Sequence, residues 1–200
     1  MKSKWILITG LLFIGCYKNV TNYYADTQDN GLAIFSNTGN NIFSCYVNGQ
    51  PWRTANRTTG GFLSQPRSEV HLSKQADSSS QDFLVFQWNG HLQQSPNDYD
   101  IITLYLKIPK NFTRNDISSF QGQRFVIDSS RGYFSANING FNNNNERGTG
   151  NIYFNSASFD SSGLAGYTGK LSGILEADFP GFKITKGRFD HQLSFLQVQF

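Results

Sequence analysis

The sequence predicts an all-β protein and favours an antiparallel β-sandwich of about ten strands, with a closed or partly open β-barrel as the alternative. Three observations support this prediction. First, the 200 residues include 18 Phe, 9 Tyr and 19 Gly but only three Glu, a composition typical of pleated surfaces joined by turns. Second, several segments alternate polar and apolar residues. Third, turn-forming pairs separate these segments.

The alternation is clearest in segments 100–108 and 170–179. In the first, Ile102, Leu104 and Leu106 share one face, and polar residues occupy much of the other. In the second, apolar and charged residues alternate in the same way. A period of two is typical of strands with one face buried and one in water. Further strands are predicted at 42–47, 69–73, 83–88, 124–128, 133–138, 151–159, 182–189 and 193–200.

Turn signals predict where two of the strands end. Asn48-Gly49 and Asn89-Gly90 are pairs that tolerate the positive φ angles of tight hairpins. We therefore expect the segment 83–88 to end at the second pair and to form a hairpin with a strand near His91 or Asp100.

Two further local features are predicted. Gly187 is expected to mark a β-bulge, so that Phe189 can return to the core. Segment 111–120 has room for one helical turn, and no other segment is typical of a helix.

The first 15 residues are typical of a signal peptide. Lys2 and Lys4 supply its positive end, and the apolar run that follows is shorter than the roughly 20 residues of a membrane-spanning helix. The run ends at Gly15-Cys16, which resembles the bacterial lipobox, although Phe13 stands where Leu is usual. In a lipobox the cysteine is acylated and becomes the first residue of the mature chain. We expect the membrane to be a partner, bound through palmitate-like chains on Cys16.

The domain organisation follows from this start. Residues 16–41 are predicted to be a lipidated N-terminus and flexible tether, because Asn and Gly are frequent and periodicity is absent. Residues 42–200 have the length of a single all-β domain with one core. The expected location is the cell envelope, at the outer membrane.

Charge and cysteine content exclude several functions. Of the 17 Lys and Arg residues, Lys2 and Lys4 lie in the predicted signal peptide, so the mature chain is nearly balanced against its 14 Asp and Glu residues. Nucleic-acid binding would require a strongly basic surface. Cys45 is the only cysteine besides Cys16, so neither a disulfide within the mature chain nor a multi-thiolate metal site is expected.

No catalytic motif is present, and we expect neither an enzyme nor a cofactor nor a metal site. His71, His91 and His191 are far apart in sequence and lack metal-ligand spacing. Glu176 and Asp178 share the outer face of one predicted strand, whereas glycoside hydrolysis needs carboxyl groups on both sides of the bond. A polysaccharide hydrolase nevertheless remains an alternative on these two acids.

Aromatic side chains are the candidates for ligand binding. Trp52, Tyr99 and Tyr133 could stack on sugar rings. For Trp52, which follows the predicted turn, a position as a large lid over one end of the core is favoured over a stacking role. Trp88 lies in an apolar segment and is expected in the core.

Three segments resemble an uncharacterised family of small Bacteroidota lipoproteins. They are residues 43–52 (FSCYVNGQPW), which resemble its V-N-G-x-x-W opening, and residues 171–176 (LSGILE) and 184–190 (ITKGRFD), which resemble its two closing strands. The resemblance implies an all-β domain behind a lipobox and supplies no activity.

The expected function is therefore a membrane-tethered, non-enzymatic binding or accessory module, with a glycan or an envelope protein as partner. Besides the hydrolase, an outer-membrane β-barrel component is an alternative, because Leu196, Val198 and Phe200 alternate up to an aromatic C-terminus.

Overall fold

The computed structural model describes residues 23–54, 70–76, 81–141, 147–159, 167–194 and 198–199. These residues form strands and one short 3-10 helix, η1 (Arg114–Phe120), which fulfils the helical turn predicted at 111–120. The strands are β1 (Ile42–Val47), β2 (Gln50–Thr54), β3 (Val70–Ala76), β4 (Asp82–Leu92), β5 (Asp100–Lys107), β6 (Arg124–Ile127), β7 (Gly132–Asn137), β8 (Arg147–Phe159), β9 (Tyr167–Asp178), β10 (Lys183–Ser194) and β11 (Val198–Gln199).

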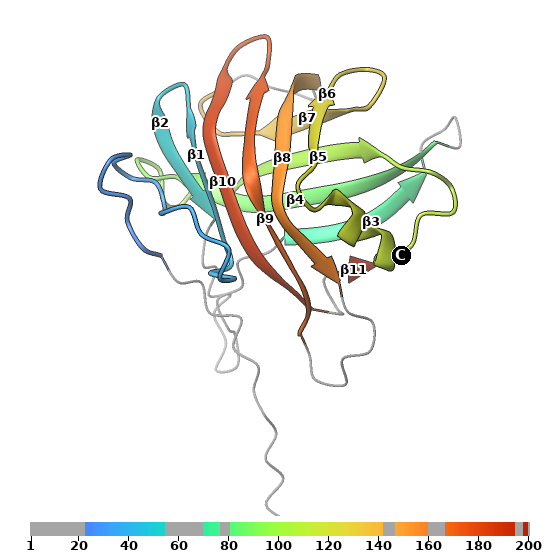
Figure 1. Ribbon diagram of the computed structural model, residues 1–200. Helices are drawn as coiled ribbons and strands as arrows, with labels where there is room; N and C mark the ends of the chain where they lie inside the picture. The colour runs from blue at the N-terminus through green and yellow to red at the C-terminus, as the bar shows by residue number, and fades with distance from the viewer. Residues whose placement is uncertain are drawn as a thin grey trace, which may run out of the picture.

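Eight of these strands close into an antiparallel β-barrel (Figure 1). Around the ring the order is β1, β2, β4, β5, β7, β8, β9 and β10, and β10 pairs again with β1. The predicted all-β class is confirmed. The predicted sandwich is wrong, and the barrel that was its alternative forms instead. Closure leaves no free edge within the ring.

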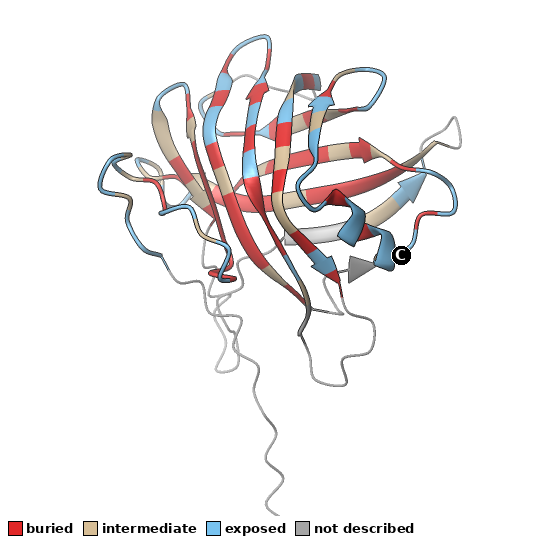
Figure 2. Cartoon of the chain, in the orientation of Figure 1, coloured by how far each residue is buried: buried red, intermediate tan, exposed pale blue. Residues whose placement is uncertain are grey.

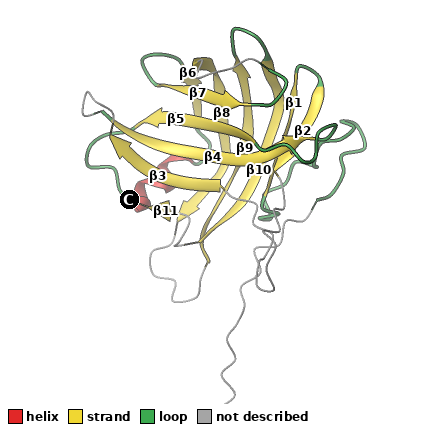
Figure 3. Ribbon diagram, turned by 180° about the vertical axis from the view of Figure 1, so that it is seen from behind, coloured by secondary structure: helices red, strands yellow, loops and turns green. Residues whose placement is uncertain are grey.

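β4 is the strand that joins the two parts of the wall (Figure 3). One of its edges pairs with β3 over residues 82–88 and then with β2 over residues 90–92. The other edge pairs with β5 over residues 83–90. If β4 ended at residue 88, its pairing with β2 would be lost and the strands would form one open sheet, so the length of β4 explains why the barrel closes. The inward faces are apolar in a sandwich and in a barrel alike, and the sequence pattern therefore does not distinguish them.

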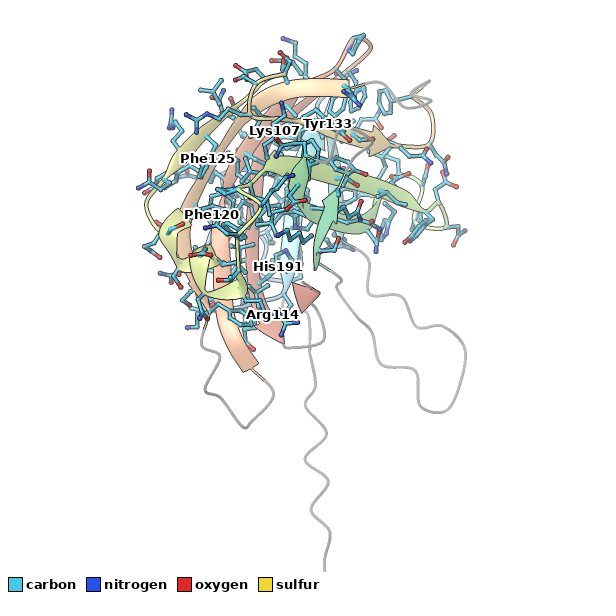
Figure 4. All side chains as sticks on the ribbon, turned by 90° about the vertical axis from the view of Figure 1, so that its right-hand side faces the viewer. Lys107, Arg114, Phe120, Phe125, Tyr133 and His191 are labelled. Atoms are coloured by element: carbon cyan, nitrogen blue, oxygen red, sulfur yellow. The ribbon has the colours of Figure 1, made fainter. Side chains whose placement is uncertain are left out.

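Three elements lie beside the ring. β3 pairs with β4, β11 pairs with β3 in parallel, and β6 pairs with β8 next to β7. The helix η1 lies against β8 and buries Ile117 and Phe120. The ring of Phe120 stacks on that of Phe154 with centroids 5.2 Å apart, and Figure 4 shows Phe120 and Phe125 on this side. The helix thus covers the interior next to β8.

Side chains fill the interior of the barrel. Buried and more exposed residues alternate along much of the wall, as the bands of Figure 2 show. An eight-stranded barrel has an interior just wide enough for side chains, and aromatic rings occupy much of it here. Among the described residues, the aromatic side chains that are less than 2% exposed are Trp52, Trp88, Phe43, Phe86, Phe134, Phe154 and Phe189.

The Asn48-Gly49 turn is confirmed and connects β1 directly to β2. Asn48 has a φ of 47° and Gly49 a φ of 82°, which are the positive values that a two-residue hairpin requires. The sequence analysis did not predict β2. Pro51 masks this strand, because its nitrogen cannot donate a ladder hydrogen bond.

The turn predicted at Asn89-Gly90 is wrong, because β4 continues through both residues to Leu92. Gly90 instead allows β2 to pack closely against β4, because it has no side chain. A Cβ atom on Gly90 would lie 2.4 Å from the Trp52 ring and 2.3 Å from the Arg53 carbonyl oxygen. The expected hairpin with a strand at Asp100 is confirmed.

At the other end of the chain, the strand limits predicted after residue 182 are also wrong, because β10 extends to Ser194 in place of ending at 189. The predicted bulge is confirmed, since the register between β9 and β10 shifts between Ile184 and Gly187. Phe189 then returns to the interior, where it is 1% exposed.

Residues 23–41 of the predicted tether lie against the outside of the barrel at β1 and β10, at the left of Figure 1. Residues 23–35 form a small hairpin around a bridge between Ala25 and Ala33, which we call the N-terminal hairpin. The predicted signal peptide and Cys16 lie outside the described residues. Within the described ranges, no helix has the length and apolar character needed to cross a membrane.

Candidate functional site

Trp52 lies inside the barrel and has no exposed surface. Its indole Nε1–H donates a hydrogen bond of 3.1 Å to Oδ2 of Asp100, and its ring packs 5.4 Å from that of Phe43. The side chain therefore presents no ring face at the surface. Tyr99, in the connection before β5, is 40% exposed but lies outside the two grooves described next.

Tyr133 lies on the outer face of the barrel and lines a groove with a volume of about 240 Å³. We call it the Lys107–Arg147 groove, after its two cations. It is formed where β4, β5, β7 and β8 lie next to one another, and Figure 4 labels Lys107 and Tyr133 close together there. The lining residues are Phe83, Lys107, Ser129, Gly132, Tyr133, Arg147, Gly148 and Thr149.

The floor of this groove is a stack of side chains centred on Tyr133. Tyr105 is its direct partner across β5 and β7, and the two rings stack with centroids 4.5 Å apart. The guanidinium carbon of Arg147, from β8 on the other side of β7, lies 4.2 Å from the centroid of the same ring. The Tyr133 ring thus lies between a second ring and a cation, so this stack positions Arg147 by a cation–π contact.

The groove is positively charged. Lys107 Nζ donates a hydrogen bond of 2.8 Å to the carbonyl oxygen of Ser129. Among the described residues, no carboxylate lines the groove, and none forms an ion pair with Lys107 or Arg147. Burial, together with the neighbouring Tyr133, raises the pKa of Tyr105. Its hydroxyl group therefore stays neutral and does not offset the two cations.

A second groove, of about 360 Å³, lies on the outer face of β6, β8, β9 and β10. Four residues that are successive cross-strand partners cross it, namely Arg124, Tyr153, Ile174 and Arg188. We call it the Arg124–Arg188 groove. It is the less positive of the two, because carboxylates already pair with two of its cations. Arg188 pairs with Asp26 and Asp29, and Lys186 pairs with Asp29. Glu176 adds a further negative charge to the lining.

The two acids considered for hydrolysis do not face each other. Glu176 and Asp178 are both exposed on the outer face of β9. Asp178 forms a surface ion pair with Lys183 at 3.0 Å. Two carboxyl groups on one side of one strand do not flank a glycosidic bond from opposite sides.

The two histidines whose side chains the structure describes, His91 and His191, lie on different sides of the barrel wall. His91 is on the outer face of β4, where burial and the nearby Arg53 lower its pKa. His191 lies inside the barrel. The side chain of His71 is outside the described set. Among the described residues, no three His, Cys, Asp or Glu side chains are placed to hold a metal ion.

Sequence reasoning missed Lys107 and Arg147 as a pair. One signal was available for the first, because Lys107 shares the outward face of segment 100–108 with Tyr105. Arg147 follows a run of Asn residues and gave no such signal. Only the pairing of β5 with β7 and of β7 with β8 brings both cations to Tyr133.

Comparisons of the chain with protein-family models, with curated proteins and with solved structures find no match. The resemblance to small Bacteroidota lipoproteins therefore stays an expectation. The function has to be argued from the two grooves and from the sequence.

Proposed function

We propose that the protein is a lipoprotein of the cell envelope, held at the outer membrane by fatty acyl chains on Cys16, and that its barrel is a non-enzymatic module that binds an anionic glycan. The binding site is the Lys107–Arg147 groove. The observation that carries this proposal is that two cations share one groove with hydroxyl groups and aromatic rings, and that no described residue lining it carries a carboxylate.

The chemistry of the lining favours an acidic group on the ligand. A guanidinium group presents parallel N–H donors that match a carboxylate or phosphate, and an ammonium group adds a compact positive charge. Arg147 is positioned over Tyr133 and supplies the first, and Lys107 supplies the second. Ser129 and Thr149 add side-chain hydroxyls that suit the hydroxyl groups of a sugar.

The size of the groove favours one unit of a longer chain. Its volume of about 240 Å³ is below the roughly 300 Å³ at the lower end of small-molecule sites. One acidic sugar therefore suits it better than a large free ligand. Single-site affinity is then modest, and many tethered copies on one membrane would strengthen attachment to a repeating polymer.

Two alternatives have less support. A hydrolase needs a carboxyl pair across the bond, and the described lining of the Lys107–Arg147 groove contains no carboxyl group. A membrane-embedded barrel carries apolar side chains on its lipid-facing surface. Here the interior is apolar, and the outer face of β9 and β10 carries Glu176, Asp178 and Lys186.

Binding is tested by isothermal titration with oligogalacturonate and, in parallel, with neutral galacto-oligosaccharides of the same length. We expect binding of the acidic oligomer only, weakened by added salt. Lys107→Gln with Arg147→Gln should reduce its affinity at least about tenfold, since charged hydrogen bonds contribute roughly 1.5 to 3 kcal/mol each. The matched control is Arg124→Gln, which removes a cation from the other groove. Equal binding of neutral and acidic oligomers, or a loss only in Arg124→Gln, would overturn the assignment.

The anchor is tested separately. Mass spectrometry of the mature protein from membranes should find Cys16 as the first residue, carrying acyl chains. An unmodified N-terminus would refute the lipoprotein part of the proposal and leave the groove assignment untouched.

A further inference from the structure

Large apolar side chains are exposed together on the N-terminal hairpin. Tyr23, Tyr24, Ile34 and Phe35 are 37%, 59%, 49% and 40% exposed. Elsewhere in the described ranges only Tyr99, Val126 and Ile174 are large, apolar and exposed, and they lie apart from one another in sequence. A cluster of exposed apolar side chains is typical of an interaction surface.

The backbone of the hairpin pairs these side chains across its two strands. The bridge between Ala25 and Ala33 is antiparallel, and the amide of Ile34 donates a hydrogen bond of 2.8 Å to the carbonyl oxygen of Tyr24. Tyr24 is therefore opposite Ile34, and the same register places Tyr23 opposite Phe35. Because side chains alternate along a strand, the two pairs point to opposite faces of the hairpin. Tyr24 and Ile34 are the more exposed pair.

The hairpin is fixed to the barrel wall. Arg188 on β10 forms ion pairs with Asp26 and Asp29, which lie in the turn of the hairpin. The amide of Ala33 donates a hydrogen bond of 2.9 Å to Oγ of Ser44 on β1. A surface bound by the hairpin would therefore orient the whole barrel.

The chain that follows the hairpin is fixed as well. The carboxylate of Asp190 accepts hydrogen bonds from the amides of Thr38, Gly39 and Asn40. The shortest of these hydrogen bonds, at 2.8 Å, comes from the amide of Gly39. The connection from the hairpin to β1 is thus held along β10 and does not act as a loose linker.

The charges around the cluster suit an anionic bilayer surface. The carboxylates of Asp26 and Asp29 are neutralised by Arg188 and Lys186. The guanidinium carbon of Arg53 lies 4.9 Å from the centroid of the Tyr23 ring and adds a positive charge.

The length of the preceding chain places the cluster near the membrane. Tyr23 is seven residues after Cys16, a span of at most about 25 Å when fully extended. If Cys16 is acylated, the hairpin cannot leave the vicinity of the lipid headgroups. This restriction raises its effective concentration at the bilayer.

We propose that the N-terminal hairpin seats the barrel on the bilayer, with Tyr24 and Ile34 inserted among the lipid headgroups. Tyrosine rings favour this interface, and exposed apolar side chains gain from burial there. The inference rests on the proposed acylation of Cys16.

Seating has a consequence for the binding site. The hairpin lies on β1 and β10, and β7 is four strands away from β1 in either direction around the ring of eight. The Lys107–Arg147 groove, which contains Tyr133 of β7, is therefore on the opposite wall. A seated barrel presents this groove to the solution, where a polymer can reach it.

The test uses the full chain expressed with its own leader, purified from membranes and reconstituted into phosphatidylethanolamine–phosphatidylglycerol vesicles. A fluorescent thiol label is attached to Ile34→Cys or, as a control, to Asn137→Cys, which is exposed on β7. Cys45 is fully buried and should not react. We expect brominated lipids to quench the label at position 34 at least about twofold more than the label at position 137. Equal quenching at the two positions would overturn the proposed seating. A label at position 34 that is buried in a protein dimer would not be quenched, and this result would overturn the seating as well.

Matched variants carry the label at position 34. Tyr24→Ser should abolish most of the quenching difference, whereas Val126→Ser should leave it unchanged. Equal effects of the two variants would overturn the proposal. The intact mass of each sample reports acylation independently. An unmodified Cys16 refutes the anchor, while an acylated sample with a water-exposed label at position 34 refutes only the seating.

Discussion

Inside the barrel, the indole Nε1–H of Trp88 donates a hydrogen bond of 3.1 Å to Nε2 of His191. Nε2 accepts, so in the neutral ring the proton is on Nδ1. Both side chains are almost completely buried. Burial lowers the pKa of His191 to about 4, and the neighbouring Asp190 opposes this shift only in part. The histidine is therefore a neutral acceptor that satisfies a buried indole.

The first prediction is acid destabilisation through His191. Its pKa is about 4 in the folded protein against an ordinary value of 6.5, so the unfolded chain binds more protons between these values. The free energy of unfolding should fall as pH decreases from 6.5 to 4, by roughly 3 kcal/mol from this group, and this group should have no effect above that window.

Urea unfolding of the wild type and of His191→Gln between about pH 7 and 5 measures this effect. Gln keeps an acceptor for Trp88 but does not titrate, so the stability of the variant should depend less on pH. His91 is present in both proteins and cancels in the comparison. Parallel pH profiles would show that His191 does not carry the effect.

The second prediction concerns Asp100, which organises one end of the barrel interior. Its carboxylate accepts hydrogen bonds from Nε1 of Trp52 and from the amides of Leu92 and Asn139, at 3.0 to 3.1 Å. Asp100→Ala leaves three donors without their acceptor and should lower the free energy of unfolding by about 3 to 5 kcal/mol. Urea unfolding followed by tryptophan fluorescence measures the loss. The exposed Asp98→Ala should stay within about 0.5 kcal/mol of the wild type.

The third prediction compares two glycines. A Cβ atom on Gly173 would lie 2.1 Å from the carbonyl oxygen of Tyr153 and 2.5 Å from the Phe189 ring. Gly173→Ala must move a strand and should cost about 3 kcal/mol of stability. Gly49 has a φ of 82° but open space around it, so Gly49→Ala should cost only about 1 kcal/mol. Similar costs in thermal or urea unfolding would contradict the close approach at Gly173.

The fourth prediction concerns the attachment of the N-terminal hairpin. Arg188→Gln should speed amide hydrogen exchange in residues 26–34 and leave exchange in β4 and β5 unchanged, because Arg188 pairs with Asp26 and Asp29. Lys170→Gln, on the exposed face of β9, is the matched control. Hydrogen exchange measured by mass spectrometry at neutral pH tests this prediction. Unchanged exchange in the hairpin would contradict the assigned role of Arg188.

Acid should release the hairpin in the same way. Backbone hydrogen bonding from Gln28, with Arg188 next in importance, lowers the pKa of Asp26 below its usual 3.8, and Lys186 is the main cause of the lowered pKa of Asp29. Carboxylates with lowered pKa values contribute stability above pH 3.8 that is lost as pH falls through the lowered values. The protection of the hairpin amides, measured as their exchange rate relative to the intrinsic rate at each pH, should therefore be lost only under strongly acid conditions.

Strand content was largely predictable, and two errors show the limit. β2 was missed because Pro51 weakens its strand signal, yet Trp52 and Thr54 still point inward. Asn89-Gly90 resembles a turn but lies within β4, since Gly90 is needed where the Trp52 ring crosses the strand. Both errors come from contacts between neighbouring strands, which a local pattern does not contain.

The candidate site was predictable only in part. Tyr133 was singled out as an aromatic residue that could stack on a sugar ring, and the structure places it in a groove. Trp52 was singled out with it and is a core side chain bonded to Asp100. The same residue type serves both purposes, and only the pairing of strands decides between them.

The sequence by itself determined the all-β class, the residues that point inward along β5 and β9, the turn at Asn48-Gly49 and the bulge at Gly187. These depend on a side-chain period of two and on backbone angles, which are properties of neighbouring residues. Tertiary structure alone decided the closure of the barrel, the meeting of Lys107 with Arg147 and the bond from Trp88 to His191. Each depends on which distant strands become neighbours, and that choice is made by packing of the whole core rather than by any local segment.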